Sequence, residues 1–245
     1  MGKESMGEFL ESAAASVLRF EHSWQTVIEN YHLLRPESLK KKHEPKVSSI
    51  EIDVFAYGYY DGMHRVLPKK PYILAPHKLN EILLVQCKDE WYEHEHIPAT
   101  KFLYKAEEIV RLHYPSPNVR KVIVTLLLAP KALESLRDSD IQIICNVAHL
   151  NNRIRKMRVS EREREKLKDL LDEYVQNGTI GDLRYEIVYP LLGQIYQHIK
   201  RKNQTSLTNF PSLAMQCFRF FVNLNHFSDD TTYFPFISDN FDNVG

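Results

Sequence analysis

The chain has 245 residues, and its 32 lysine and arginine residues balance 32 aspartate and glutamate residues, so the formal net charge is zero. This length accommodates one large domain or two modest ones. Hydrophobic residues make up 43% of the chain and charged residues 26%, as in an ordinary globular protein. The charge balance argues against a surface that binds nucleic acid throughout, although positive charge can still be concentrated locally.

Three features of the sequence favour a cytoplasmic location. No apolar run approaches the roughly 20 residues needed to cross a bilayer. The first residues are acidic and helical in pattern, unlike a secretory signal peptide. The cysteines, which are Cys87, Cys145 and Cys217, have unrelated spacings and predict no disulfide framework, as expected in a reducing compartment.

An amphipathic helix is predicted from about Lys3 to Arg19, because apolar residues recur there at helical spacing. Glu8 and Glu11 lie three residues apart beside the apolar stripe. Either glutamate can simply be a solvated side chain favoured by the helix dipole. A strand is predicted next, from Trp24 to Leu34.

Residues 35–46 contain two prolines and clustered lysines but no apolar periodicity, so we expect a loop. This loop leads directly into a predicted strand, and its lysines can contact a phosphate backbone there or be solvated. The lysines concerned are Lys40, Lys41 and Lys42.

Residues 49–55 and 82–88 are predicted to form strands, because apolar and β-branched residues dominate and polar residues occupy alternate positions. Successive side chains of a strand point to opposite faces, so the polar residues of each strand should share a face. These residues are Glu51 and Asp53 in the first strand, and Gln86 and Lys88 in the second.

Pairing of these two strands would bring a carboxylate, an amide and an ammonium group to one edge of the sheet. Carboxylate and carbonyl oxygens are suitable ligands for Mg²⁺, and a neighbouring lysine supplies positive charge. This combination is typical of phosphodiester hydrolysis. The alternative is an ordinary cross-strand ion pair between Asp53 and Lys88, worth less than about 1 kcal/mol.

At these residues the sequence resembles the PD-(D/E)XK nuclease superfamily, most closely the branch of Mrr-type restriction endonucleases and archaeal Holliday junction resolvases. In that branch the second motif is often Gln-x-Lys, as in Gln86-Cys87-Lys88, and the first is an aspartate after an apolar residue, as in Ile52-Asp53. The family's first helix carries a glutamate, which corresponds to Glu11. The resemblance covers about residues 5–150.

The resemblance implies a restriction-endonuclease-like α/β fold, in which helices flank a mixed β-sheet. It also implies a Mg²⁺-dependent endonuclease that hydrolyses phosphodiester bonds in DNA, with Mn²⁺ as a substitute metal. Asp53, Gln86, the backbone carbonyl of Cys87 and Glu11 would bind the metal. Lys88 would orient the attacking water, help to deprotonate it and stabilise the phosphate, and Glu51 would be an accessory carboxylate.

Other functions remain open on the sequence. A Holliday junction or branched-DNA resolvase shares the same core, although the long insertion between Asp53 and Gln86 argues against a compact one. A non-catalytic nucleic-acid-binding or assembly protein could also retain the fold. For a DNA-cutting enzyme we expect a homodimer, because two copies related by a two-fold axis can cut both strands.

Residues 57–81 connect the two predicted strands and contain interleaved aromatic and basic residues. This composition suits contact with nucleic acid or packing of the loop on its own domain. His94 and His96 invite a zinc site, but further ligands at suitable spacing are lacking, so a surface loop is preferred. The basic residues of the insertion are Arg65, Lys69 and Lys70.

A helix is predicted from Thr100 to His113, followed by a strand at 122–128, a short helix at 130–137 and a strand at 141–145. This order predicts a mixed sheet with helices on its faces. It completes a nuclease-like domain of residues 1–150.

The character of the chain changes near Asn151, and residues 151–245 are predicted to form a helical region of unknown role. A capping box at Ser160 starts a helix that ends near Gly178. Further helices are predicted at 182–201, with an interruption at Pro190, and at 211–225. Basic residues before the capping box are candidate contacts to nucleic acid: Arg153, Arg155, Lys156 and Arg158.

Overall fold

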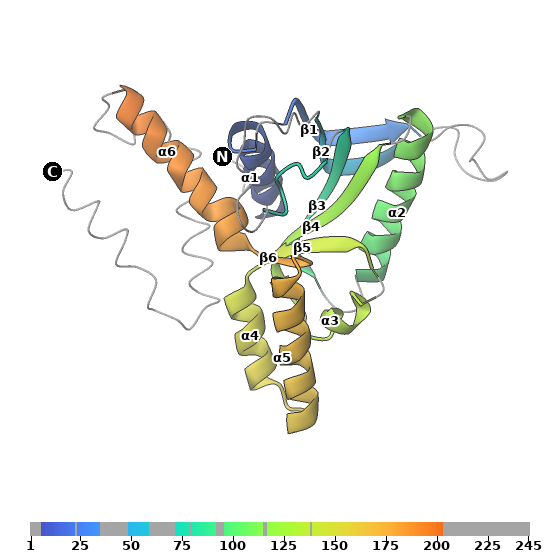
Figure 1. The fold of residues 1–245 in the computed structure, drawn as a ribbon, viewed down its shortest axis with the longest axis vertical. Helices are drawn as coiled ribbons and strands as arrows, with labels where there is room; N and C mark the ends of the chain where they lie inside the picture. Colours follow the sequence, from blue (N-terminus) through green and yellow to red (C-terminus); the bar gives the residue numbers. More distant parts are fainter. Residues whose placement is uncertain are drawn as a thin grey trace.

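The protein is an α/β protein whose six-stranded mixed sheet is flanked by helices on both faces (Figure 1). The computed structural model describes residues 6–22, 24–34, 49–58, 72–78, 80–91, 96–114, 117–137 and 139–202. Within these ranges, none of the helices combines the length and apolar character needed to cross a membrane.

The strands follow one another in the sheet in the same order as in the chain. β1 and β2 are antiparallel, as are β2 and β3, whereas the later neighbours are parallel. The strands are β1 (Thr26–Leu34), β2 (Ser49–Gly58), β3 (Glu81–Trp91), β4 (Asn118–Leu128), β5 (Ile141–Cys145) and β6 (Ile180–Asp182).

Helices fill the connections between the parallel strands and also precede and follow the sheet. They are α1 (Met6–Phe20), α2 (His96–His113), α3 (Ala132–Ser135), α4 (Val147–Lys156), α5 (Glu161–Gln176), the π-helix η2 (Arg184–Val188) and α6 (Tyr189–Lys202). Figure 1 shows α1 and α2 on opposite sides of the sheet, with α4 and α5 side by side at its lower end.

Each face of the sheet packs against its own apolar layer. On the α1 face, side chains of the strands pack with α1, η2 and the start of α6. On the α2 face, they pack with α2, α3, α4 and α5. Burial of apolar side chains on both faces stabilises the central strands, which explains why residues 122–128 of β4 are an almost continuous apolar run.

The structure confirms the predicted α/β class and the mixed sheet. β4 nevertheless begins at Asn118, before the predicted start at Val122. The polarity pattern does not reveal this first part of the strand, because it contains two charged residues that form ion pairs. Arg120 Nε donates to Glu81 Oε1 at 2.6 Å. Lys121 is ion-paired with Asp140 and Glu107 and is only 1% exposed. Charged residues at buried positions hide a strand from a polarity pattern.

The described part after residue 150 is mostly helical, as expected, but it is not purely helical. β6 pairs with β5 and so extends the sheet. A strand of three residues is too short to produce a period-two pattern. The change in character at Asn151 falls inside α4, which runs across residue 150.

The helix predicted at 182–201 is present, but its first part is a π-helix. Asp182 still belongs to β6, η2 follows it, and α6 begins only at Tyr189. Pro190 lies just after this π-helical turn, so the helix continues through it, and its missing N–H falls where π-helical geometry changes to α-helical. The helix predicted at 211–225 lies outside the described residues.

The capping of α5 agrees with the sequence. Ser160 Oγ accepts a hydrogen bond from Glu163 N at 3.3 Å, as the capping box predicts. At the other end, Gly178 has φ +78°, a left-handed conformation that side chains rarely adopt. Glycine at this position lets the chain turn directly from α5 into β6.

Candidate active site

The first candidate residue, Asp53, lies where β2 and β3 stop pairing. The ladder between these strands begins at Val54, opposite Val85. The Asp53 carboxylate reaches across to β3, where Oδ2 accepts hydrogen bonds from the Cys87 N–H and from Gln86 Nε2, both at 2.6 Å. The sequence prediction that the Asp53 and Gln86 strands are neighbours is therefore confirmed, and the two side chains are in direct contact.

Gln86 carries an unsatisfied oxygen at this position. Its Nε2 donates to Asp53, whereas within the described part of the chain no donor reaches its buried Oε1. Leaving a buried acceptor without a partner costs about 1–3 kcal/mol. A cation beside Asp53 would satisfy this oxygen, and amide oxygens are ordinary ligands of hard divalent cations.

Glu11 brings a second carboxylate to the site from α1. Burial raises the pKa of Glu11 to about 7, with further increases from the charges of Asp53, Glu8 and Glu51 and a partial decrease from Lys88. These mutual effects mean that the acidic groups and the lysine act on one another electrostatically. At neutral pH a substantial fraction of Glu11 is protonated.

Asp53 itself is 8% exposed, and burial raises its pKa. The Cys87 N–H, the charge of Lys88 and the Gln86 amide act in the opposite direction because they stabilise the ionised form. Burial also raises the pKa of the Cys87 thiol, with smaller increases from Asp53 and Glu11. The thiol is therefore not available as a thiolate ligand or nucleophile, and Cys87 contributes through its backbone.

Glu51 and Lys88 occupy the exposed margin of the site. Both influence Asp53, since Glu51 raises its pKa and Lys88 lowers it. An exposed ammonium group beside a buried carboxylate can contact a ligand that approaches from solvent. This position suits a group that interacts with an anionic substrate.

The donor set fits a hard cation better than zinc. Among the residues that the structure describes, no three His, Cys, Asp or Glu side chains form a cluster able to hold a metal ion. Mg²⁺ is commonly held by one or two carboxylates and retains several waters. Asp53, the free oxygen of Gln86 and the nearby Glu11 match that requirement.

The structure does not bring every candidate residue to this site. Figure 1 places α4 at the lower end of the molecule, away from α1 and β2, and α4 packs on the α2 face. The basic residues of this helix and the turn after it, Arg153, Arg155, Lys156 and Arg158, therefore lie apart from Asp53. Lys40, Lys41, Lys42, Arg65, Lys69, Lys70 and His94 lie outside the described residues.

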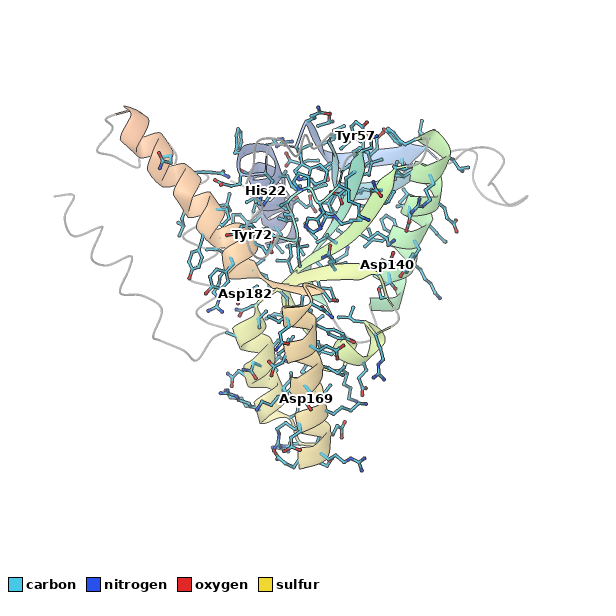
Figure 2. The ribbon with its side chains drawn as sticks, in the orientation of Figure 1. His22, Tyr57, Tyr72, Asp140, Asp169 and Asp182 are labelled. Atoms are coloured by element: carbon cyan, nitrogen blue, oxygen red, sulfur yellow. The ribbon has the colours of Figure 1, made fainter. Side chains whose placement is uncertain are left out.

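A second buried polar network was missed by the sequence analysis. Glu186 of η2 accepts hydrogen bonds from the backbone N–H groups of Ile73 and Leu74, at 2.9 and 3.3 Å. Arg120 donates to the carbonyls of Ile73 and Ala75, both at 2.6 Å. These bonds anchor the segment 72–78, and Figure 2 shows its Tyr72 between α1 and the base of α6. The network fixes the chain just before β3.

Asn30 of β1 was also missed, although it lies opposite Asp53. Its backbone is left-handed, with φ +52°. The available signal was an asparagine in the middle of a predicted strand, because asparagine is depleted in strands and enriched at positive φ.

No protein-family model matches the chain, and neither curated protein sequences nor solved structures give a match. The chemistry of the site must therefore be inferred from its own residues.

Proposed function

We propose that the protein is a divalent-metal-dependent nuclease that hydrolyses phosphodiester bonds in DNA. The observation that supports this function most is the contact between Asp53 and Gln86, in which a buried carboxylate lies beside an amide oxygen that no donor among the described residues reaches. Glu11 and Lys88 add a second carboxylate and a positive charge to the same site.

In this proposal Asp53, Gln86 Oε1 and Glu11 hold Mg²⁺, and the backbone carbonyl of Cys87 is a further candidate ligand. The metal would polarise the phosphate and lower the pKa of an attacking water. Gln86 Nε2 and the Cys87 N–H hold the Asp53 carboxylate in place, which preorganises one ligand before the metal binds.

Lys88 is proposed to act on the attacking water and the phosphate rather than on the metal. Its ammonium group is exposed to solvent and acts electrostatically on both Asp53 and Glu11. It would orient the attacking water and stabilise the negative charge that develops on the phosphate. Glu51 remains an accessory carboxylate at the margin of the site.

The proposed substrate is duplex DNA cut in a restriction-like manner by a cytoplasmic homodimer. The chain has no net charge, so its affinity for DNA would come from local patches of positive charge. Binding should then weaken with salt, but less steeply than for a strongly basic protein.

Cleavage of supercoiled plasmid with Mg²⁺ or Mn²⁺ tests the function. Asp53→Asn and Lys88→Ala should abolish cleavage, whereas Glu108→Gln and Lys105→Ala, at exposed positions of α2, should retain it. Plasmid binding without cleavage by the wild-type protein would instead support a non-catalytic nucleic-acid-binding protein. Cleavage that survives Asp53→Asn would remove this site from the chemistry.

A further inference from the structure

β1 changes the face to which its side chains point at Asn30. Before this residue, Val27 packs in the layer on the α1 face, and Glu29 accepts a hydrogen bond from Arg19 of α1 at 2.7 Å. After it, Tyr31 and Leu33 pack in the layer on the α2 face. Regular alternation would keep these four odd-numbered residues on one face.

β2 undergoes the same change at Asp53. Ile50 and Ile52 pack on the α2 face, whereas Val54 and Ala56 pack on the α1 face. Ile52 and Phe55, three positions apart, thus share a face. The alternating apolar residues of the sequence are therefore divided between two layers.

The two changes occur at the same level of the sheet. Glu29 is paired with Val54 and Tyr31 with Ile52, in one continuous register that skips Asn30 and Asp53. Since the register is the same on either side, neither strand contains an extra residue, and this is not a β-bulge. Both strands turn over together, so partners across the ladder still point to a common face.

We propose that Asn30 is a positioning residue for the site at Asp53. Its left-handed backbone turns β1 over, β2 follows, and the Asp53 carboxylate is thereby directed along the sheet toward Cys87 N and Gln86. The inference rests on the proposed function only in so far as Asp53 binds a metal.

Packing on the α2 face makes the change of face in β1 and the change of face in β2 depend on each other. Tyr31 lies against Phe55, with ring centroids 4.5 Å apart, and Leu33 is buried. An extended Asn30 would return Tyr31 and Leu33 to the α1 face. Tyr31 would then lose its contact with Phe55, and Leu33 would leave the apolar layer in which it is buried. The chain can keep these contacts, and the Asp53 geometry, only while residue 30 stays left-handed.

Asparagine suits this position because it tolerates the left-handed region better than other residues with a Cβ. Among the described residues, Asn30 and Asn80 are the non-glycine positions with positive φ, at +52° and +51°. Asn80 precedes β3 and is exposed, as Asn30 is. It therefore provides a matched control, with the same backbone cost outside the site.

The test compares Asn30→Ala, Asn30→Gly and Asn80→Ala by hydrogen exchange of the Cys87 amide relative to the Val85 amide, and by calorimetric titration with Mn²⁺. Asn30→Ala should speed relative exchange at Cys87 and weaken Mn²⁺ binding, each by about tenfold, the size of a left-handed penalty on alanine. In Asn30→Gly, relative exchange at Cys87 and Mn²⁺ affinity should both lie within about twofold of the wild-type values, because glycine adopts positive φ freely. Asn80→Ala should leave both unchanged.

Wild-type exchange at Cys87 in Asn30→Ala, or an Asn30→Gly variant as impaired as Asn30→Ala, would overturn the inference. If the wild-type protein binds no Mn²⁺, the proposed function fails separately. The Cys87 amide then still decides whether Asn30 positions Asp53.

Discussion

Asn30 and Asp53 lie opposite each other in adjacent strands at the one level that the β1–β2 ladder skips. One of the two has a left-handed backbone, and the other sends its carboxylate to the neighbouring strand β3. A local departure from strand geometry thus coincides with the contact of Asp53 with Gln86 and Cys87. Such departures cost free energy and persist where the surrounding structure determines them.

Substitution of Lys88 separates chemistry from folding. Lys88 is exposed, so Lys88→Ala should change the free energy of unfolding by no more than about 0.5 kcal/mol. The same variant should lose plasmid cleavage, because the positive charge beside the phosphate is gone. Urea unfolding and a cleavage assay on one preparation measure both effects. Undiminished cleavage would remove Lys88 from the site.

Gln86→Glu tests the unsatisfied oxygen. The variant would place a second carboxylate against Asp53, which already accepts the Gln86 amide at 2.6 Å. Repulsion between the two should lower the melting temperature without metal, and added Mg²⁺ should raise it more than in the wild-type protein. Thermal melts with and without Mg²⁺ measure this difference. Equal Mg²⁺ shifts in the two proteins would show that residue 86 does not contact the metal.

Metal affinity should depend on pH through Glu11. Because its pKa is raised to about 7, the carboxyl is largely protonated at pH 6 and largely ionised at pH 8. A cation binds the ionised form, so Mn²⁺ affinity should rise between these values and then level off. Calorimetric titration across this range should give a flatter curve for Glu11→Gln. An equally steep curve for that variant would assign the pH dependence to another group.

Glu186 should give the protein a distinct pH-dependent stability. Burial raises its pKa to about 7, against the pull of two backbone N–H groups and Arg120. The folded state then binds a proton more tightly than the unfolded state. The stabilisation that proton binding by Glu186 gives the folded state is complete below the unfolded pKa near 4.5. It is lost as pH rises to about 7, which lowers the free energy of unfolding by on the order of 3 kcal/mol.

Urea unfolding of the wild-type protein and Glu186→Gln at pH 5 and pH 8 measures this contribution. The loss of stability between the two pH values should be smaller in the variant. Glu108→Gln, at an exposed position of α2, serves as a control. Identical losses in the wild-type protein and Glu186→Gln would mean that the pKa of Glu186 is the same in the folded and unfolded states.

The contact between Asp53 and Gln86 was accessible from the sequence because both strands carry apolar residues in alternation and the motif spacing aligned them. The turning over of β2 was not, since Ile50, Ile52, Val54 and Ala56 form an unbroken alternation in the sequence. The signal for that change lies in the backbone of the neighbouring strand. Strand pattern alone cannot report it.

Two other features of the structure, the position of Arg120 and the strand β6, could not be predicted from the sequence for a similar physical reason. Arg120 is charged and belongs to no motif, and its partners Glu81, Ile73 and Ala75 are assembled only in the folded protein. β6 is specified by its pairing with β5 rather than by its own three residues. Long-range partners decide both cases, and a local window of sequence contains none of them.

Anomalous diffraction from a crystal soaked in Mn²⁺ tests the central claim most directly. The account predicts a peak between the Asp53 carboxylate and Gln86 Oε1, on the side toward Glu11, and no such peak in Asp53→Asn. A fully soaked wild-type crystal without density at this position, or with Mn²⁺ bound only elsewhere, would contradict it.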